Sequence, residues 1–161
     1  MSPPAIRPVD FNDSACTADF LDLLDHYMRG PSGSGQAMTD ALRARLPAEL
    51  SRRPTVMSFI AYVGDRAAGL ITCVEGFSTF AGRPLFNIHD IVVHGDFRRQ
   101  GIAKALLAHA EHVARERDCC KLTLEVLEGN TGARLAYEGF GFQGYQLDPA
   151  MGKALFMEKK L

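Results

Sequence analysis

The chain has 161 residues, a formal net charge of −1, and a composition that is 47% hydrophobic and 23% charged. A chain of this size can bury a core without disulfides or metal ions, so we expect one domain over residues 1–161. The near-zero net charge argues against nucleic acid or a membrane surface as a partner, and no apolar run is long enough to span a bilayer.

The N-terminal residues and the cysteines both predict a cytoplasmic protein. Met1-Ser2-Pro3-Pro4 lacks the cationic and apolar regions of a secretory signal. The four cysteines, Cys16, Cys73, Cys119 and Cys120, contain no Cys-x-x-Cys pair. They are typical of small buried side chains in a reducing compartment.

Two helices are predicted in the first third of the chain. Asp13 or Ser14 can cap the first, which ends at a Gly-Pro pair. Residues 30–36 are rich in glycine and serine, and they form either a linker between the helices or a mobile lid over a substrate pocket. Thr39 can cap the second helix, whose last turn Pro47 is expected to bend or separate.

Seven stretches have the composition of β-strands. They lie at residues 5–9, 55–63, 67–77, 85–94, 121–127, 142–147 and 154–159. Gly64-Asp65 is a hairpin signal, so the strands up to residue 94 are expected to run antiparallel. Helices are predicted over 101–117 and 130–139. This order indicates a mixed α/β (α+β) protein with helices on the faces of one sheet.

A basic turn joins the strand that ends at Val93 to the helix that begins near Gly101. The start of a helix leaves backbone N–H groups without partners, and its dipole favours an anion. Arg98 and Arg99 add positive charge, while Gly101 and Ala103 are small enough for a phosphate to approach the backbone. The turn therefore predicts a pyrophosphate-binding site.

Two motifs together resemble the Gcn5-related N-acetyltransferases (GNAT). The first is Arg98-x-x-Gly101-x-Ala103, following Val92-Val93. The second consists of Asn130, Ala133, Tyr137 and Gly141-Phe142. The likeness is clear over 88–142 and weaker over 56–161. Arg99 and Gly95 depart from the family pattern, which usually has glycine and proline at these positions.

The resemblance implies a fold, a co-substrate and a set of binding residues. The GNAT fold has a central, mostly antiparallel mixed sheet of six to seven strands and about four helices. Acetyl-CoA is the implied co-substrate, a small-molecule amine the implied acceptor, no metal is required, and a homodimer is expected. The implied cofactor-binding residues are Ile91, Val92, Val93, Arg98, Arg99, Gln100, Gly101, Ile102, Ala103, Lys104, Asn130, Ala133 and Tyr137.

The resemblance also suggests catalytic residues. Tyr137 is the candidate acid that protonates the departing thiolate. His89 and Asp90 are the candidate bases, although neighbours on a strand face opposite ways unless a bulge intervenes. Histidine at position 89 could equally be a structural core residue. Glu125 is a weaker third candidate, more readily explained as a solvated carboxylate.

Other residues allow a functional and a structural interpretation. His109 and His112 share a helix face and could bind a metal, but a solvated face is favoured. Phe77, Phe80 and Phe86 could wall an acceptor pocket or belong to the core. Two alternatives to a small-amine acetyltransferase stay open: an enzyme that acetylates proteins or peptides, and a non-catalytic acyl-CoA sensor.

Overall fold

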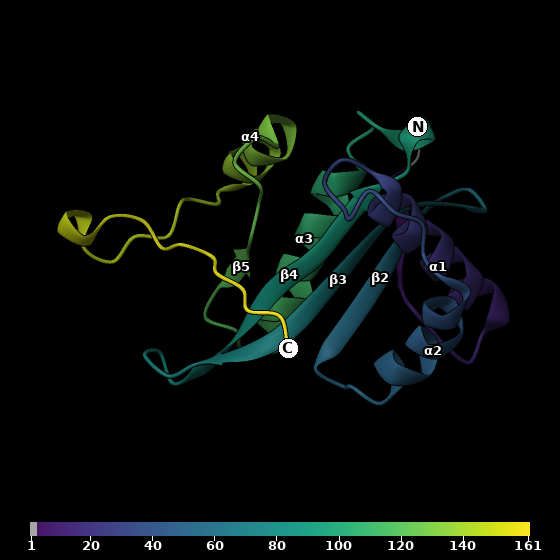
Figure 1. The fold of residues 1–161 in the computed structure, drawn as a ribbon, viewed down its shortest axis with the longest axis horizontal. Coiled ribbons are helices and arrows are strands. Elements are labelled where there is room, and N and C mark those ends of the chain that lie inside the picture. The colour runs from purple at the N-terminus through teal and green to yellow at the C-terminus, as the bar shows by residue number, and fades with distance from the viewer. Residues whose placement is uncertain (1–2) are drawn as a thin grey trace. The chain divides into compact units, whose positions relative to one another are not determined.

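The computed structural model describes residues 3–161, which form two compact units, one reaching to Leu124 and one from Glu125 to Leu161. The first unit contains a five-stranded sheet with the order β1-β2-β3-β4-β5 (Figure 1). Its strands are β1 (Ala5–Pro8), β2 (Val56–Val63), β3 (Arg66–Ser78), β4 (Arg83–Val93) and β5 (Leu122–Leu124). Neighbouring strands pair antiparallel except β4 and β5, which run parallel.

The predicted capping residues begin the first two helices. Asp13 accepts hydrogen bonds from the N–H groups of Ala15 and Cys16 at the start of α1 (Ser14–Arg29). Thr39 caps α2 (Asp40–Ser51), which continues through Pro47 as one helix. A 3-10 turn, η1 (Gly95–Phe97), and α3 (Ile102–Glu116) follow β4.

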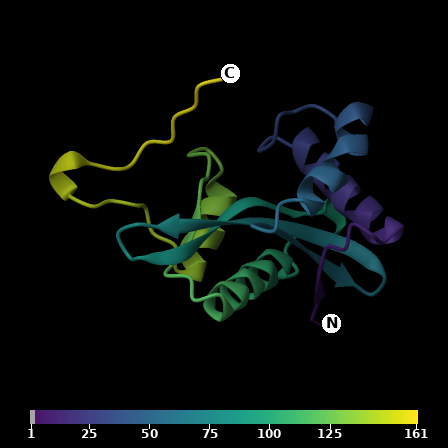
Figure 2. The same cartoon turned by 90° about the horizontal axis from the view of Figure 1, so that it is seen from below.

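The helices of the first unit cover both faces of its sheet. Figure 2 shows α3 on one face, with α1 and α2 on the other. On the α1 side the buried core includes Phe20, Leu23, Ile60 and Leu70. On the other face, α3 buries Ile102, Leu106, Leu107, Ala110 and Ala114, the stripe expected for an amphipathic helix. Within residues 3–161, no helix is both long and apolar enough to cross a bilayer.

The second unit contains α4 (Thr131–Phe140) and a 3-10 turn, η2 (Pro149–Met151). The strands predicted at 142–147 and 154–159 are absent from it, so the described chain has five strands rather than six or seven. One backbone hydrogen bond, from Ala154 N–H to Tyr145 O at 3.3 Å, links these stretches. β-Propensity makes a strand only where a partner and a buried face exist, and Leu155 and Met157 are 83% and 85% exposed.

Candidate active site

The turn after β4 is anchored at one point and open elsewhere. Phe97 is only 7% exposed and fixes η1 to the sheet. Gly101 adopts φ +79° as the residue before α3, in the left-handed region that favours glycine. An added Cβ at Gly101 would meet no atom within 4 Å, so the space over this backbone is open. Both properties suit the approach of a bulky anion.

The start of α3 presents donors and positive charge together. The first hydrogen bond that closes the helix runs from Ala105 N–H to Gly101 O at 3.0 Å. The N–H groups ahead of Ala105 therefore have no acceptor inside the helix, and Gly101 offers no side-chain cap. Arg98, Arg99 and Lys104 are exposed around the turn. This arrangement fits a pyrophosphate.

Two residues of the turn have structural features that the motif did not predict. Arg99 has φ +61°, although it is not glycine. This conformation costs a non-glycine residue about 1–2 kcal/mol. That cost explains why glycine is the usual residue at this position in the family that the sequence resembles. The Gln100 side chain donates from Nε2 to Asp96 O at 3.1 Å, so it braces the turn from within.

A bulge in β4 resolves how the two candidate bases are arranged. Cys73 pairs with Ile88 and Thr72 with Asp90, which leaves His89 as an extra residue. His89 is exposed and Asp90 is half-buried. Pairing with β5 ends at Ile88 opposite Leu124, while β4 continues to Val93. The strand therefore leaves its parallel neighbour at the bulge, just before the turn.

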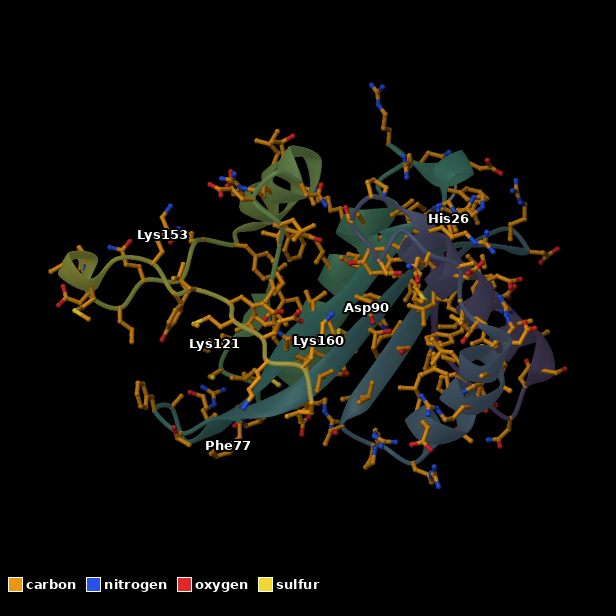
Figure 3. All side chains as sticks on the ribbon, viewed as in Figure 1. His26, Phe77, Asp90, Lys121, Lys153 and Lys160 are labelled. Carbon is orange, nitrogen blue, oxygen red and sulfur yellow. The ribbon has the colours of Figure 1, made fainter. Side chains whose placement is uncertain are left out.

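Asp90 lies in an environment that favours its neutral form. Burial raises the pKa of the Asp90 carboxyl, while the charge of His89 acts in the opposite direction. Burial also raises the pKa of Tyr27 on α1, and the charge of Asp90 adds to that rise. The negative charge of Asp90 therefore opposes ionisation of the Tyr27 phenol. Figure 3 labels Asp90 on β4 in this region.

The loop over residues 30–36 is folded onto the end of α1. Gly35 N–H donates to Met28 O at 2.8 Å, and Gly33 N–H donates to Gly30 O at 3.1 Å. A Cβ at Gly33 would collide with the carbonyl oxygen of Tyr27, so glycine permits this close approach. The loop therefore begins beside Tyr27 and has a defined conformation of its own.

The second motif organises α4 in the second unit. Asn130 Oδ1 accepts a hydrogen bond from Ala133 N–H at 3.3 Å and caps the helix. Gly141, at φ +108°, ends it. The Tyr137 ring meets Phe142 edge-on with centroids 6.0 Å apart, and Phe142 N–H donates to Tyr137 O at 2.9 Å. The motif residues thus have structural roles in addition to any contact with a ligand.

Comparison with known proteins identifies the family. A model described as the acetyltransferase (GNAT) family matches residues 19–142. The chain belongs to the acetyltransferase (GNAT) family. It is 31% identical over 83 residues to a thialysine N-epsilon-acetyltransferase of Caenorhabditis elegans, a match covering 52% of this chain and 51% of the relative. Matches to the first curated relatives thus span about half of their length.

Two further comparisons cover more of the chain. A glucosamine 6-phosphate N-acetyltransferase of Trypanosoma brucei brucei is 26% identical over 129 residues, or 78% of this chain and 82% of the relative. The crystal structure of a probable acetyltransferase superimposes with a TM-score of 0.82 at 22% identity, covering 97% of this chain and 98% of that one. The GNAT fold expected from the sequence is confirmed, with fewer strands than predicted.

Several residues for which the sequence allowed a functional role are in structural or solvent-exposed positions. Phe86 is fully buried, which agrees with the core interpretation of this residue rather than with a pocket wall. Phe77 and Phe80 are 63% and 90% exposed where β3 turns into β4, and Figure 3 labels Phe77 at that end of the sheet. His109 packs edge-on against Phe59 with centroids 4.6 Å apart. His112 lies 3.4 Å from Glu116, and residues 3–161 hold no group of three or more metal-ligand side chains.

Sequence reasoning missed two residues that interact with the candidate site. The sequence does not single out Tyr27, because nothing in the local pattern connects it to Asp90. Gly69 on β3 lies where α3 meets the sheet. A Cβ there would approach Val92 O and Ile102 Cγ2 to 2.9 Å each, so this glycine sets the distance between α3 and β4.

Replacement of Gly69 with alanine is expected to destabilise the protein by about 1–3 kcal/mol through overpacking. The Val92 carbonyl is backbone and cannot rotate away, so α3 or β4 must shift. Urea unfolding of Gly69→Ala measures the loss. Gly76→Ala is the matched control on the same strand, because its Cβ would meet Leu85 only at 3.4 Å. Equal losses in the two variants would contradict this account.

Proposed function

We propose that this GNAT protein transfers the acetyl group of acetyl-CoA to the primary amine of a small molecule by direct attack in a ternary complex. The observation that carries the proposal is the turn before α3, where open backbone N–H groups, a left-handed Gly101 and exposed arginines coincide. The family match supports acetyl-CoA as the co-substrate. The names of both relatives, a thialysine and a glucosamine 6-phosphate N-acetyltransferase, contain a small-molecule amine.

The binding residues follow from the backbone geometry. The N–H groups from Gly101 to Lys104, with Arg98 and Arg99, would hold the pyrophosphate. The backbone of Ile91–Val93, beyond the end of the β5 pairing, would bind the pantetheine amides. Asn130 and Ala133 on α4 are proposed to contact the co-substrate through their positions in the second motif.

Acid and base roles are proposed for Tyr137 and Asp90. Acetyl-CoA supplies the acetyl group as a thioester. Asp90 would accept a proton from the acceptor ammonium, which must become neutral before its nitrogen can form a bond to the acetyl carbon. Tyr137 would donate its phenolic proton to the sulfur as the carbon–sulfur bond breaks. His89, exposed at the bulge, is the second candidate base.

The surroundings of Asp90 favour a cationic acceptor. A half-buried carboxylate is destabilised by lost hydration, and an ammonium ion beside it would offset that loss. This environment supports a small amine over an anionic or neutral acceptor.

The activity is tested with acetyl-CoA and a panel of amines, amino acids, polyamines, amino sugars and short peptides, with release of free CoA thiol as the readout. Release with small amines supports the proposal. Release with peptides alone would assign the protein to the protein acetyltransferases. Tight acetyl-CoA binding without release for any acceptor would favour a sensor.

Binding at the turn is tested by Gly101→Ala, with Gly82→Ala as a matched control. Both glycines have positive φ, +79° and +62°, and no atom within 4 Å of an added Cβ, so the backbone strain is similar. Only Gly101 lies in the proposed phosphate site. We expect the Kd for acetyl-CoA, measured by calorimetry, to rise about tenfold or more in Gly101→Ala and to stay unchanged in Gly82→Ala. Equal effects would contradict the assignment.

We also propose a cytoplasmic homodimer. All four cysteines are free, as a reducing compartment would maintain them. Large apolar side chains are exposed near the end of the chain, and a second copy would shield them from water. They are Leu147, Met151, Leu155, Phe156 and Met157. Sedimentation at micromolar concentration distinguishes a monomer from a dimer.

A further inference from the structure

Two histidines stack beneath the turn that we assign to the pyrophosphate. His26 lies on α1, where Figure 3 labels it, and His94 follows β4 directly. Their ring centroids are 4.7 Å apart with an interplanar angle of 28°. Neither histidine has a part in the proposed chemistry, and neither belongs to the motifs that identified the family.

His94 holds the first residues of the turn. Its Nδ1 accepts a hydrogen bond from Asp96 N–H at 3.3 Å, which caps η1. Its ring also meets the edge of Phe97, the buried anchor of the turn, with centroids 6.2 Å apart. Because Nδ1 can accept this bond only when it carries no proton, the cap requires one particular neutral form of the ring.

Asp96 and Phe97 are held from the other side by Arg66. Its guanidinium lies 2.6 Å from the Asp96 carboxylate and 4.7 Å above the centre of the Phe97 ring. The Asp96 carboxylate is also 3.9 Å from His94 Nδ1. A proton on His94 would therefore turn Nδ1 from an acceptor of the Asp96 backbone into a donor to its side chain, in competition with Arg66.

Charged groups of both signs face the histidine pair from each element around it. They are Asp19, Asp22 and Asp25 of α1, Asp65 and Arg66 at the β2–β3 hairpin, and Asp96 and Arg98 of the turn. An open cavity of about 360 Å³ adjoins both rings, so protons can reach them from solvent. Burial, followed by the charges of His94 and Arg98, lowers the pKa of His26, while Asp25 and Asp96 oppose that shift.

We propose that His94 is a positioning residue for the phosphate-binding turn, and that its stacking on His26 makes acetyl-CoA affinity depend on both rings being neutral. The inference rests on the proposed function of the turn. With both rings uncharged, the pair stacks and the cap on Asp96 is made. A proton on His94 would break the cap, and a proton on each ring would set two like charges face to face. The turn loosens and its N–H groups lose their common direction.

The test is acetyl-CoA affinity between about pH 8 and pH 5.5, the range in which imidazole changes charge. His94→Asn is the central variant, since an asparagine side chain accepts the N–H two residues later without titrating. His94→Ala removes the cap at every pH. His26→Phe keeps an aromatic ring against His94 but removes one charge. The co-substrate's own phosphates also titrate near pH 6, so each variant is compared with the wild type at the same pH.

We expect His94→Asn to match the wild type at pH 8 and to bind about fivefold more tightly than it at pH 5.5, the ratio expected from one cap. His94→Ala should bind about fivefold more weakly than the wild type at pH 8. His26→Phe should show a shallower pH dependence. Circular dichroism at each pH verifies that the variants are folded.

Two results would overturn the proposal in different ways. If the wild type binds acetyl-CoA at pH 8 but His94→Asn has the same pH dependence, the histidine pair does not position the turn and the proposed function stands. If the wild type does not bind acetyl-CoA at pH 8, the assignment of the turn fails, and this inference fails with it.

Discussion

Replacement of Asp90 with asparagine is expected to lower the turnover number about 10²- to 10⁴-fold, the usual contribution of a general base. Asparagine has nearly the same shape but cannot accept the ammonium proton. Because burial raises the pKa of Asp90, the wild-type rate should fall on the acid side at a higher pH than for an ordinary carboxyl group. Steady-state kinetics across the pH range measures both effects.

The same substitution is expected to stabilise the fold at neutral pH. A carboxyl group whose pKa is raised in the folded state binds its proton more tightly there, so its ionised form opposes folding above that pKa. The asparagine side chain carries no charge, so Asp90→Asn should raise the free energy of unfolding at pH 7. The gain should vanish at acidic pH, where both states of the wild type are protonated. Urea unfolding at two pH values measures it.

His89→Gln is the control for the assignment of the base. His89 is the extra, exposed residue of the bulge, so its replacement should leave turnover within a fewfold of the wild type. If His89→Gln loses the activity and Asp90→Asn retains it, the base is His89. Lower stability of Asp90→Asn at pH 7 would contradict the account of its environment.

Replacement of Tyr137 with phenylalanine is expected to lower the turnover number by a similar factor of about 10²- to 10⁴-fold, since the ring stays but the proton donor is lost. The edge contact with Phe142 and the hydrogen bond from Phe142 N–H to Tyr137 O do not involve the hydroxyl. The Kd for acetyl-CoA should therefore change far less than the turnover number. Rapid-mixing measurement of the acetyl-transfer step, with calorimetry for binding, separates these quantities.

Tyr145→Phe is the matched control for Tyr137→Phe. Tyr145 belongs to the same unit and is 52% exposed, but it lies outside both motifs. Its loss of a hydroxyl should leave the acetyl-transfer rate unchanged. Full activity of Tyr137→Phe with every active acceptor would remove Tyr137 from the mechanism and leave the acid to another group.

Local signals in the sequence were enough to predict most of the first unit. Asp13 and Thr39 are caps in the structure, as expected, because capping depends on a side chain and the N–H groups two or three residues later. The hairpin at Gly64-Asp65 joins β2 and β3 as predicted. The predictions that failed depended on contacts with residues distant in the chain. Residues 142–147 and 154–159 have strand-like composition, but the structure gives them no ladder of hydrogen bonds.

The candidate site was predictable only where a motif encodes backbone geometry. The motif indicated that Gly101 is small enough for a phosphate to approach the backbone, but its left-handed conformation is seen only in the structure. From the sequence, a bulge at His89 could be stated only as the condition under which His89 and Asp90 face the same way, since it depends on how β3 pairs with β4. The contacts of Gly69, and the neighbourhood of Tyr27 and Asp90, join residues far apart in the chain. No spacing rule in a single sequence reveals such pairs.

The bulge in β4 has a consequence for how this strand can change over evolution. Side chains on a strand alternate between faces, so inserting or deleting one residue exchanges inside and outside beyond that point. His89, as an unpaired extra residue, interrupts the alternation between Ile88 and Asp90. The residues of β4 before His89 can therefore be constrained by packing in the core, and those after it by ligand binding. Loss of the His89 codon would remove the bulge and leave Asp90 opposite Thr72, on the face it already occupies. Loss of a codon after Asp90 would instead turn the remaining residues of β4 to the opposite face, so this part of the strand is constrained in length as well as in composition.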